Sequence, residues 1–534
     1  MKRRSDKKSS VIIIDFGSQY TRLIARRVRG LGYYSRVVPA TARYEEVMSA
    51  DVGALIFSGG PESVTDARAP KLDETLLTAG VPILGICYGM CLLVRHYGGV
   101  IASQRRGEYG PAMIDVLPGG RKVGRRGVGG GAGSSFYRDV PNRHCVWMSH
   151  GDSIVEVPNH FTVTALSRSK AGELIASFED RKLRLYGVQY HPEVVHTVYG
   201  EKLLKNFLQR VACLRRMWSV PSYLKVIEKT LRREVGPKRS IVVAVSGGVD
   251  STVMAVLLAR LFKRRLKLVL VDNGLLREDE VREISDFYEN HLQLPLRVID
   301  AKSEFLTALA GVRDPERKRH IIGRMFVKVF FANVKPIEML AQGTLYPDVI
   351  ESIATVGPSH KIKTHHNRVP EILALMKRGQ IVEPFKDLFK DEVRELGLAL
   401  KIPSALLNRH PFPGPGLAVR IVGTVTKRRL DILRKADAIL QSQLKKAKLI
   451  EKTWQIFAVL LPVRSVGVAG DRRYYGATIV IRAVSSLDGM TADFFLPSKS
   501  FLTRLSARIT GEVEGITRVV LDISSKPPAT IEWE

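Results

Sequence analysis

Three separated segments carry residues that could form a thiol-based catalytic site. Cys87 follows an apolar run and lies between Gly85 and Gly89 in PILGICYGMC. A nucleophile in such a strand-to-helix turn is exposed at the end of the strand, and the helix N-terminus favours its thiolate. The segment GVQYHPEV brings His191 and Glu193 close together, as a base and the acceptor that orients it. These residue types predict a Cys-His-Glu triad.

Each of these segments alone has a simpler explanation. An isolated cysteine is usually a small buried residue, and a lone His-Pro-Glu is more often a surface turn. The third segment, ALIFSGGPESV, ends a strand in the turn Gly59-Gly60, whose backbone N–H groups could stabilise an oxyanion. The three segments together, in this order, are far more specific than any one of them.

A second kind of site is predicted by AVSGGVDS, which follows an apolar run and opens a helix-like one. Gly247 and Gly248 let the backbone approach an anion, Ser246 and Ser251 add hydroxyls, and the helix that begins near Asp250 points its positive end at the same place. The segment lacks the Lys-Ser/Thr ending of the P-loop. It therefore favours holding a diphosphate that leaves, although a bare SGG could be an ordinary capped turn.

Two further segments could contact a nucleotide. Asp272 ends the strand-like LVLVDNG, where an acid can meet the base or the ribose, although VDNG can also be simply a turn. Lys363, His365 and His366 lie together in IKTHHN. A lid that carries them could neutralise developing charge as it closes, and a basic surface loop is the alternative.

Two proline-rich segments offer preformed anion sites near the end of the chain. Arg409 and His410 precede the rigid turn PFPGPG, and Lys526 precedes Pro527 and Pro528. Proline fixes the backbone at both places.

The elements that must position these residues divide the chain into domains of α/β type. Residues 10–212 alternate short apolar runs with Gly-rich turns, and the Gly/Arg-rich stretch 119–135 within them reads as a surface loop. Residues 213–237 read as a connecting helix or linker. Residues 238–408 repeat a buried-strand pattern that predicts a parallel sheet, and residues 409–534 predict an α+β domain.

The composition limits the class of protein. The 534 residues include 83 Lys and Arg against 53 Asp and Glu, a formal charge of +30. The basic residues are spread along the chain without a known nucleic-acid-binding motif, so a nucleic-acid partner is not expected.

No apolar run reaches the roughly 18 residues of a membrane span, and the basic start has no signal-peptide core. Four cysteines show no disulfide or metal-ligand pattern. We expect a cytoplasmic protein.

The first three segments resemble class I glutamine amidotransferases. The resemblance implies that Cys87 forms a thioester with glutamine, that His191 acts as base and then acid, and that Glu193 orients it. It also implies oxyanion-hole amides from Gly60 and Tyr88. The chain departs from the family at Cys91, where a substrate-holding Gln is usual, and at RGEYG (106–110), where Arg and Gly are exchanged.

The phosphate segment resembles the ATP-pyrophosphatase signature, which implies cleavage of ATP between its α and β phosphates. With GTLYPDVIES, IKTHHN, EPFKDLFKDEVRELGL, RHPFPGPGL and KPPATIEWE, the resemblance over nearly the whole chain is to GMP synthetases. It implies that XMP, ATP, glutamine and water give GMP, AMP, pyrophosphate and glutamate with Mg²⁺, through an adenylated XMP. Asp250 and Asp348 are only candidates for the Mg²⁺ ligands.

The same resemblance implies the remaining site residues. They are, for ATP, Ser246, Gly247, Gly248, Val249, Asp250, Ser251 and Asp272; for the lid, Lys363, His365 and His366; and for XMP, Arg409, Pro411, Lys526, Ile531 and Glu532. After Asn367 the lid reads Arg368-Val369-Pro370, which is shorter than in the family. The stretch DGMTADFFLP (488–497) is kept, and the resemblance implies a homodimer formed through this last domain.

Three alternatives stay open. An ATP-pyrophosphatase that modifies tRNA would suit the charge, but such enzymes typically need paired cysteines in the synthetase half, and none follows Cys213. A non-catalytic protein that binds nucleic acid would be expected to show decayed motifs. A synthetase that uses free ammonia would follow if Cys91 and the altered 106–110 stretch impair glutamine binding.

Overall fold

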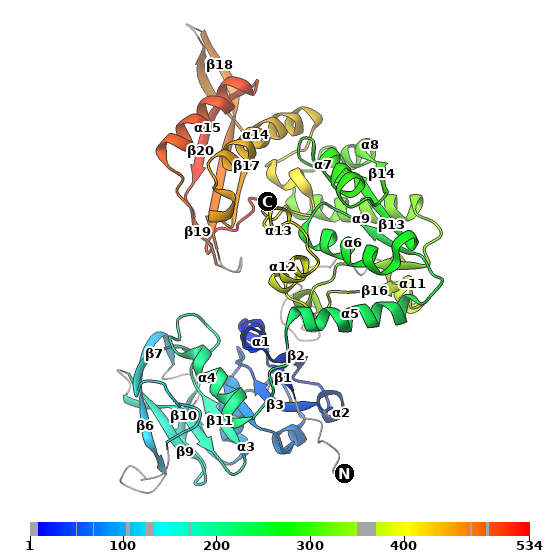
Figure 1. Cartoon of the computed structure of the whole chain (residues 1–534). Helices are drawn as coiled ribbons and strands as arrows, with labels where there is room; N and C mark the ends of the chain where they lie inside the picture. Colours follow the sequence, from blue (N-terminus) through cyan, green and yellow to red (C-terminus); the bar gives the residue numbers. More distant parts are fainter. Residues whose placement is uncertain are drawn as a thin grey trace. The chain divides into compact units, whose positions relative to one another are not determined.

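The computed structural model describes residues 9–49, 51–67, 69–102, 107–122, 133–169, 172–349, 370–469, 472–486 and 491–534. The chain forms two compact units (Figure 1). The first comprises residues 1–224 and 346–360, and the second comprises residues 225–345 and 361–534. The domain boundaries at 212, 237 and 408 stay predictions.

The first unit is built on a mixed sheet, which over the described residues has nine strands. Its parallel half is formed, in spatial order, by β2 (Tyr34–Pro39), β1 (Ser10–Asp15), β3 (Val52–Phe57), β4 (Ile83–Ile86) and β11 (Leu185–Val188). An antiparallel half continues through β10 (Gly172–Asp180), β9 (Thr162–Ser169), β6 (Glu108–Lys122) and β7 (Arg143–His150). A separate pair joins β5 (Val100–Ala102) to β8 (Ser153–Glu156).

The apolar runs of the sequence are the central strands of this sheet. VGALIF and ILGI are buried at every position, as expected for parallel strands covered on both faces. The helices of the unit are α1 (Thr21–Gly30), α2 (Tyr44–Val47), α3 (Tyr88–His96) and α4 (Gly200–Asn206).

The second unit contains a parallel sheet, as the sequence predicts. The described strands lie in the order β14 (Leu296–Asp300), β13 (Leu266–Asp272), β12 (Ile241–Ala244), β15 (Met339–Ala341) and β16 (Ile381–Val382). The helices of this part are α5 (Val220–Val235), α6 (Val249–Phe262), α7 (Glu280–Asp286), α8 (Lys302–Ala308), α9 (Pro315–Asn333), α11 (Pro370–Lys377), α12 (Lys390–Ala399) and α13 (Ser404–Leu407). Helices connect the successive strands of this sheet, and such strand–helix–strand connections favour parallel strands.

The rest of the second unit has α+β structure. A long antiparallel hairpin joins β17 (Gln455–Ala469) to β18 (Arg472–Ser485), and β18 also pairs with β19 (Asp493–Phe494) and β20 (Ile516–Asp522). The helices are α14 (Lys427–Lys446) and α15 (Lys499–Glu512). One apolar core runs through both parts of the unit, from Val242 and Phe305 to Leu433 and Phe501. The predicted α/β multidomain class is therefore confirmed.

None of the helices in the described ranges is both long and apolar enough to cross a membrane.

Candidate functional sites

Cys87 occupies a strained turn between β4 and α3. Its backbone has φ 53° and ψ −104°, a region that non-glycine residues rarely adopt and that often marks functional sites. The flanking glycines make the turn possible, because a Cβ at Gly85 would lie 2.5 Å from the Gly89 carbonyl oxygen. The Cys87 N–H donates to the carbonyl of Val188 at the end of β11, at 2.8 Å. This bond ties the turn to the strand that leads into His-Pro-Glu.

His191 and Glu193 form a buried pair just beyond that strand. Their Nδ1 and Oε1 atoms are 2.7 Å apart, and the side chains are 3% and 0% exposed. Burial opposes protonation of the imidazole, but the Glu193 carboxylate and the Cys87 thiol outweigh it and raise the pKa of His191 well above its usual value. Because the Cys87 thiol contributes to the raised pKa of His191, the three predicted residues lie in one cluster. Cys87 Sγ itself donates a hydrogen bond to the carbonyl oxygen of Ser149 at 3.6 Å.

The glycine turn after β3 lies against the same cluster. A Cβ at Gly59 would lie 3.1 Å from Cε1 of His191, and one at Gly60 would lie 3.2 Å from Cγ of Tyr88 and 2.9 Å from the Phe16 carbonyl oxygen. The structure thus brings the predicted oxyanion-hole residues, Gly60 and Tyr88, beside the triad. At Gly60 the contact with the Phe16 backbone leaves no room for a side chain.

Two residues that the sequence does not predict at this site contact His191 and Glu193. The Tyr20 ring meets the imidazole edge-on with centroids 4.9 Å apart. Arg27 donates from Nε to the Glu193 carbonyl oxygen at 3.1 Å. Both come from the first turns after β1, and no sequence pattern links that segment to residue 191.

The two departures from the amidotransferase pattern lie around this cluster. Cys91 is buried on α3, its Sγ lies 3.8 Å from Oε1 of Gln189, and burial raises the pKa of its thiol. Glu108 accepts a hydrogen bond from Ser167 at 2.9 Å and lies 3.6 Å from His150. Arg106 lies outside the described residues. The glutamate of the altered stretch is therefore held by buried partners despite the exchange beside it.

The second unit contains a cavity of about 1490 Å³ at the carboxyl edge of its parallel sheet. All six residues of the predicted phosphate loop line it, namely Ser246, Gly247, Gly248, Val249, Asp250 and Ser251. Gly247 has φ +71°, and Gly248 is the N-cap of α6. The helix therefore points its free N–H groups at the cavity, which favours a bound anion.

A lysine from another helix lies beside the predicted phosphate loop. Lys390 begins α12 and its Nζ lies 3.7 Å from Oδ2 of Asp250. Both residues line the cavity, as do the cations Arg277 and Arg319. Lys390 lies in the segment EPFKDLFKDEVRELGL, 140 positions after Asp250. At that separation the sequence alone does not predict the contact between the two residues.

Asp250 also has a feature that fits a cation. Its Oδ1 is buried and has no hydrogen-bond partner among the described residues. A carboxylate oxygen of this kind suits Mg²⁺. Asp348 belongs to the first unit, and its role as a Mg²⁺ ligand stays a prediction. No group of three or more candidate metal ligands occurs within the described ranges.

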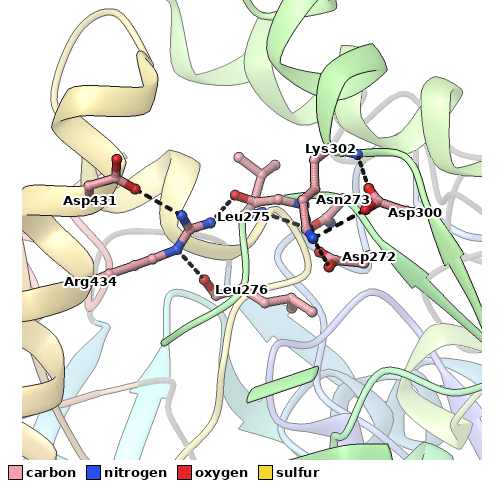
Figure 2. Close-up of polar contacts among 9 residues, drawn as sticks. Asp272, Asn273, Leu275, Leu276, Asp300, Lys302, Asp431 and Arg434 are labelled. Atoms are coloured by element: carbon pink, nitrogen blue, oxygen red, sulfur yellow. Dashed lines mark hydrogen bonds and ion pairs between the residues drawn. The ribbon is translucent and has the colours of Figure 1, made fainter. Parts of the chain in front are cut away.

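Asp272 lies at the end of β13 and is held by protein groups (Figure 2). Lys302 bridges it to Asp300, with Nζ to Oδ2 distances of 3.0 and 3.2 Å. The Asp272 carboxylate also accepts from the N–H of Gly274 at 3.0 Å. The cavity is lined by Asn273 and not by Asp272. A direct contact of Asp272 with the nucleotide therefore stays a prediction, and the observed contact is the ion pair.

Arg434 of α14 fixes the loop that follows Asp272. Its guanidinium donates to the carbonyl oxygens of Gly274 and of Leu276, the latter at 3.0 Å, and pairs with Asp431 at 3.3 Å (Figure 2). This contact orders the turn from which Arg277 enters the cavity. Arg277 lies over the Phe412 ring and pairs with the buried Asp437 at 3.1 Å.

The predicted XMP residues come together in part. Arg409 and Pro411 line the large cavity, and Arg409 lies 3.7 Å from Glu283. Gln455 joins this turn to the end of the chain, since its Nε2 donates to the Pro411 carbonyl at 2.9 Å and to Glu532 at 3.0 Å. Glu532 is further fixed by the buried Arg420 at 3.0 Å.

Ile531 and Lys526 lie on the C-terminal sheet. Ile531 packs against a small apolar cluster with Phe457 and Val480, and Lys526 exchanges two backbone hydrogen bonds with Ala492. A second cavity of about 550 Å³, lined in part by Glu532 and Thr530, lies on the same sheet.

His410 differs from the expectation of a cationic anion site. Its Nε2 lies 2.9 Å from the Ile450 carbonyl oxygen, and burial lowers its pKa. The ring is therefore neutral and engaged at pH 7. The lid residues Lys363, His365 and His366 lie outside the described residues.

Both units contain segments that match known protein families. Residues 12–211 match the family model of class I glutamine amidotransferases, and residues 442–533 match that of the GMP synthase C terminal domain. A glutamine-hydrolysing GMP synthase of Oleidesulfovibrio alaskensis is 47% identical over 534 residues, with 99% of this chain and all of the relative covered. The enzyme of the same name from Fusobacterium nucleatum is 45% identical over 533 residues, with 99% and 100% covered.

Proposed function

The chain belongs to the glutamine-hydrolysing GMP synthase family, and on that basis we propose that it amidates XMP to GMP with ATP and glutamine. The observation that carries the proposal is the presence, on one chain, of a buried Cys-His-Glu cluster and of a separate cavity lined by the loop from Ser246 to Ser251. The first releases ammonia and the second consumes it. ATP is cleaved to AMP and pyrophosphate.

In the glutaminase half, the Cys87 thiolate attacks the side-chain carboxamide of glutamine. The C–N bond breaks as imidazolium His191 gives its proton to the leaving ammonia, and the acyl group remains on sulfur. His191 then takes a proton from water, whose oxygen displaces the thiolate and yields glutamate. Glu193 holds the imidazole in place, and the N–H groups of Gly60 and Tyr88 stabilise the oxyanion.

In the synthetase half, the loop from Ser246 to Ser251 binds the pyrophosphate portion of ATP. An oxygen of XMP attacks the α-phosphate, pyrophosphate leaves, and ammonia then displaces AMP from the adenylated XMP. Lys390 and the N-terminus of α6 offset the charge on the leaving pyrophosphate. Asp250 would hold Mg²⁺, which when bound offsets further phosphate charge.

The XMP site is proposed at the junction that Gln455 forms between Pro411 and Glu532. Arg409 and Lys526 supply the cations for its phosphate, and Ile531 supplies an apolar contact. Asp272 supports the loop beside the nucleotide, and Lys363, His365 and His366 act as a lid. We further propose a homodimer formed through the C-terminal domain and a cytoplasmic location.

The experiment that tests this function is GMP formation from XMP and Mg-ATP, with glutamine and with ammonium as separate nitrogen donors. Wild-type protein should use both. Cys87→Ser should lose glutamine-dependent synthesis and keep ammonium-dependent synthesis. Loss of both in that variant would refute the two-site proposal. Wild-type synthesis from ammonium alone would instead favour the second candidate, an ammonia-dependent synthetase, for which the observation is Cys91 in place of the usual Gln.

A further inference from the structure

Part of the excess positive charge is gathered by the fold at one edge of the second unit. In the parallel sheet, β13, β12, β15 and β16 lie side by side, with Ile241 opposite both Leu266 and Met339 and with Leu340 opposite Ile381. Exposed cations precede each of these strands. They are Lys263 and Arg264 before β13, Lys238 before β12, Lys335 before β15, and Lys377 and Arg378 before β16.

Hydrogen bonds join these four strand entries. Arg265 donates to the carbonyl oxygens of Gly236 and Arg239 at 2.8 and 3.0 Å. Ser240 donates to Glu338 at 2.5 Å, and Gln380 donates to the Ile337 carbonyl at 3.1 Å. The six exposed cations, here named the amino-edge band, therefore lie in one row along this edge. Because the phosphate loop follows the other end of β12, the band lies at the opposite edge of the sheet from the cavity.

The neighbouring negative groups are too few to neutralise the band. Glu338 is held by Ser240, Glu228 pairs with Arg260 at 3.5 Å, and Glu234 is exposed at the end of α5. The helices α5, α6, α9 and α11 end at this edge, and each contributes about half a negative charge. Arg232 and Arg233 in the last turn of α5 offset part of that charge. A net positive surface remains.

The length of the amino-edge band and its lack of aromatic rings favour duplex nucleic acid as the polyanion that it binds. Four adjacent strands span about 14 Å, which equals about four steps along one strand of a nucleic-acid duplex. No exposed aromatic ring lies at these strand entries among the described residues, so the band offers nothing for unpaired bases to stack on. Contacts between a flat row of cations and the phosphate backbone carry no sequence information.

We propose that the amino-edge band binds the phosphate backbone of duplex nucleic acid without sequence preference. The binding is independent of GMP synthesis, because none of its residues lies in either catalytic site. Such binding would account for a group of cations that lies at the opposite edge of the sheet from the catalytic cavity.

The test measures fluorescence anisotropy of a labelled DNA duplex of about 20 base pairs with the full chain, between about 50 and 200 mM salt. The patch variant carries Lys238→Gln, Arg264→Gln, Lys335→Gln and Arg378→Gln. The control variant removes the same charge from exposed positions elsewhere on the unit, with Lys427→Gln, Arg428→Gln, Lys499→Gln and Arg504→Gln.

The wild type and the control should bind with an affinity that falls steeply with salt. The patch variant should bind at least about tenfold more weakly, with the slope of log K against log salt flattened by about 0.9 for each lost phosphate contact. Ammonium-dependent GMP synthesis should be equal in all three, which shows that each is folded.

Several results would overturn the proposal. Equal binding by the patch and control variants would mean that no particular surface is responsible. Displacement of the duplex by XMP and ATP would place it in the catalytic cavity. Tighter binding to single-stranded DNA, or to vesicles rich in phosphatidylserine, would assign the band to another class of partner.

Discussion

Glu193 is a buried carboxylate whose main contact is with the imidazole of His191, so its removal isolates the effect of that contact. Since Glu193 raises the pKa of His191, Glu193→Gln should lower that pKa. The imidazolium form, which protonates the leaving ammonia, should then be lost at a lower pH. We expect the alkaline limb of glutaminase kcat/KM to move to lower pH, with a maximum reduced about 10²–10⁴-fold.

The measurement is a pH–rate profile of glutamate release for both proteins. Ammonium-dependent synthesis serves as the control and should keep its wild-type profile. An alkaline limb that stays in place would mean that another group sets the pKa of the imidazole.

Cys91 is one of the two places at which the chain differs from the amidotransferase pattern, and a thiol offers only weak hydrogen bonding. Cys91→Gln adds an amide donor and acceptor beside Gln189, and we expect KM for glutamine to fall about tenfold, as one good hydrogen bond allows. KM for ammonium should not change. Because the position is buried, the melting temperature of the variant must be measured too. An unchanged KM in a fully folded variant would contradict a role for this position in binding glutamine.

The sequence was a good guide to residues that lie within one turn and a poor guide to their distant partners. Cys87, Gly60 and the loop from Ser246 to Ser251 each follow a short buried strand, so local pattern and resemblance located them. Gln455 and Lys390 make contacts set by the packing of distant elements, which no periodicity in a single sequence encodes.

At the scale of elements, the turn between β4 and α3 depends on Gly85. The backbone atoms of Gly89 and Met90 would lie 2.5–2.7 Å from a new Cβ. Gly85→Ala should therefore destabilise the protein by about 1–3 kcal/mol and shift Cys87, so that glutaminase activity falls further than stability alone explains. Thermal melting and glutamate release measure the two effects.

The matched control is Gly30→Ala at the end of α1, where nothing lies within 4 Å of the added Cβ. That variant should keep both stability and activity. Equal behaviour of the two variants would mean that the close packing around Gly85 is not required.

The N-terminus of α12 supplies Lys390 to the phosphate cavity. Lys390→Gln should reduce kcat/KM for ATP about 10²-fold with either nitrogen donor, since one charge-assisted contact is worth about 1.5–3 kcal/mol. Lys386→Gln is the control, because Lys386 is exposed nearby and does not line the cavity. Pyrophosphate release measures both. A loss confined to glutamine-dependent synthesis would argue against a contact with ATP.

The elements themselves were predictable to different degrees. The buried runs of β3, β12 and β13 were recognised as strands because parallel strands read as continuous apolar stretches. The order of the strands was not predictable, and neither was the antiparallel half from β10 to β7. Those features depend on pairing between segments far apart in the chain, where register is decided by tertiary packing.

At the scale of the whole molecule, the proposed homodimer can be tested on the hairpin of β17 and β18. Val466 pairs with Tyr475, and Val468 lies on the same face two residues further on. These side chains are 45%, 63% and 70% exposed. Val468→Glu with Tyr475→Glu should weaken dimerisation at least tenfold, or about 1.4 kcal/mol, in sedimentation velocity over a concentration series.

Val155→Glu with Leu183→Glu places the same charges on exposed apolar positions of the first unit and should leave the dimer intact. If both pairs of substitutions leave it intact, the hairpin is not at the interface.

The last residues of the second unit are held by three cations with fully buried side chains. Lys318 binds Glu534, Arg420 binds Glu532, and Arg482 binds the carbonyl oxygen of Ser524. A stop codon at position 522 would remove all of these partners, although Lys318 would keep its hydrogen bonds to the carbonyl oxygens of Ala418 and Ile421. Removing one partner of a buried ion pair costs about 3–5 kcal/mol, against a total stability of about 5–15 kcal/mol. In a genetic screen, so small a truncation should therefore have the phenotype of a complete gene deletion.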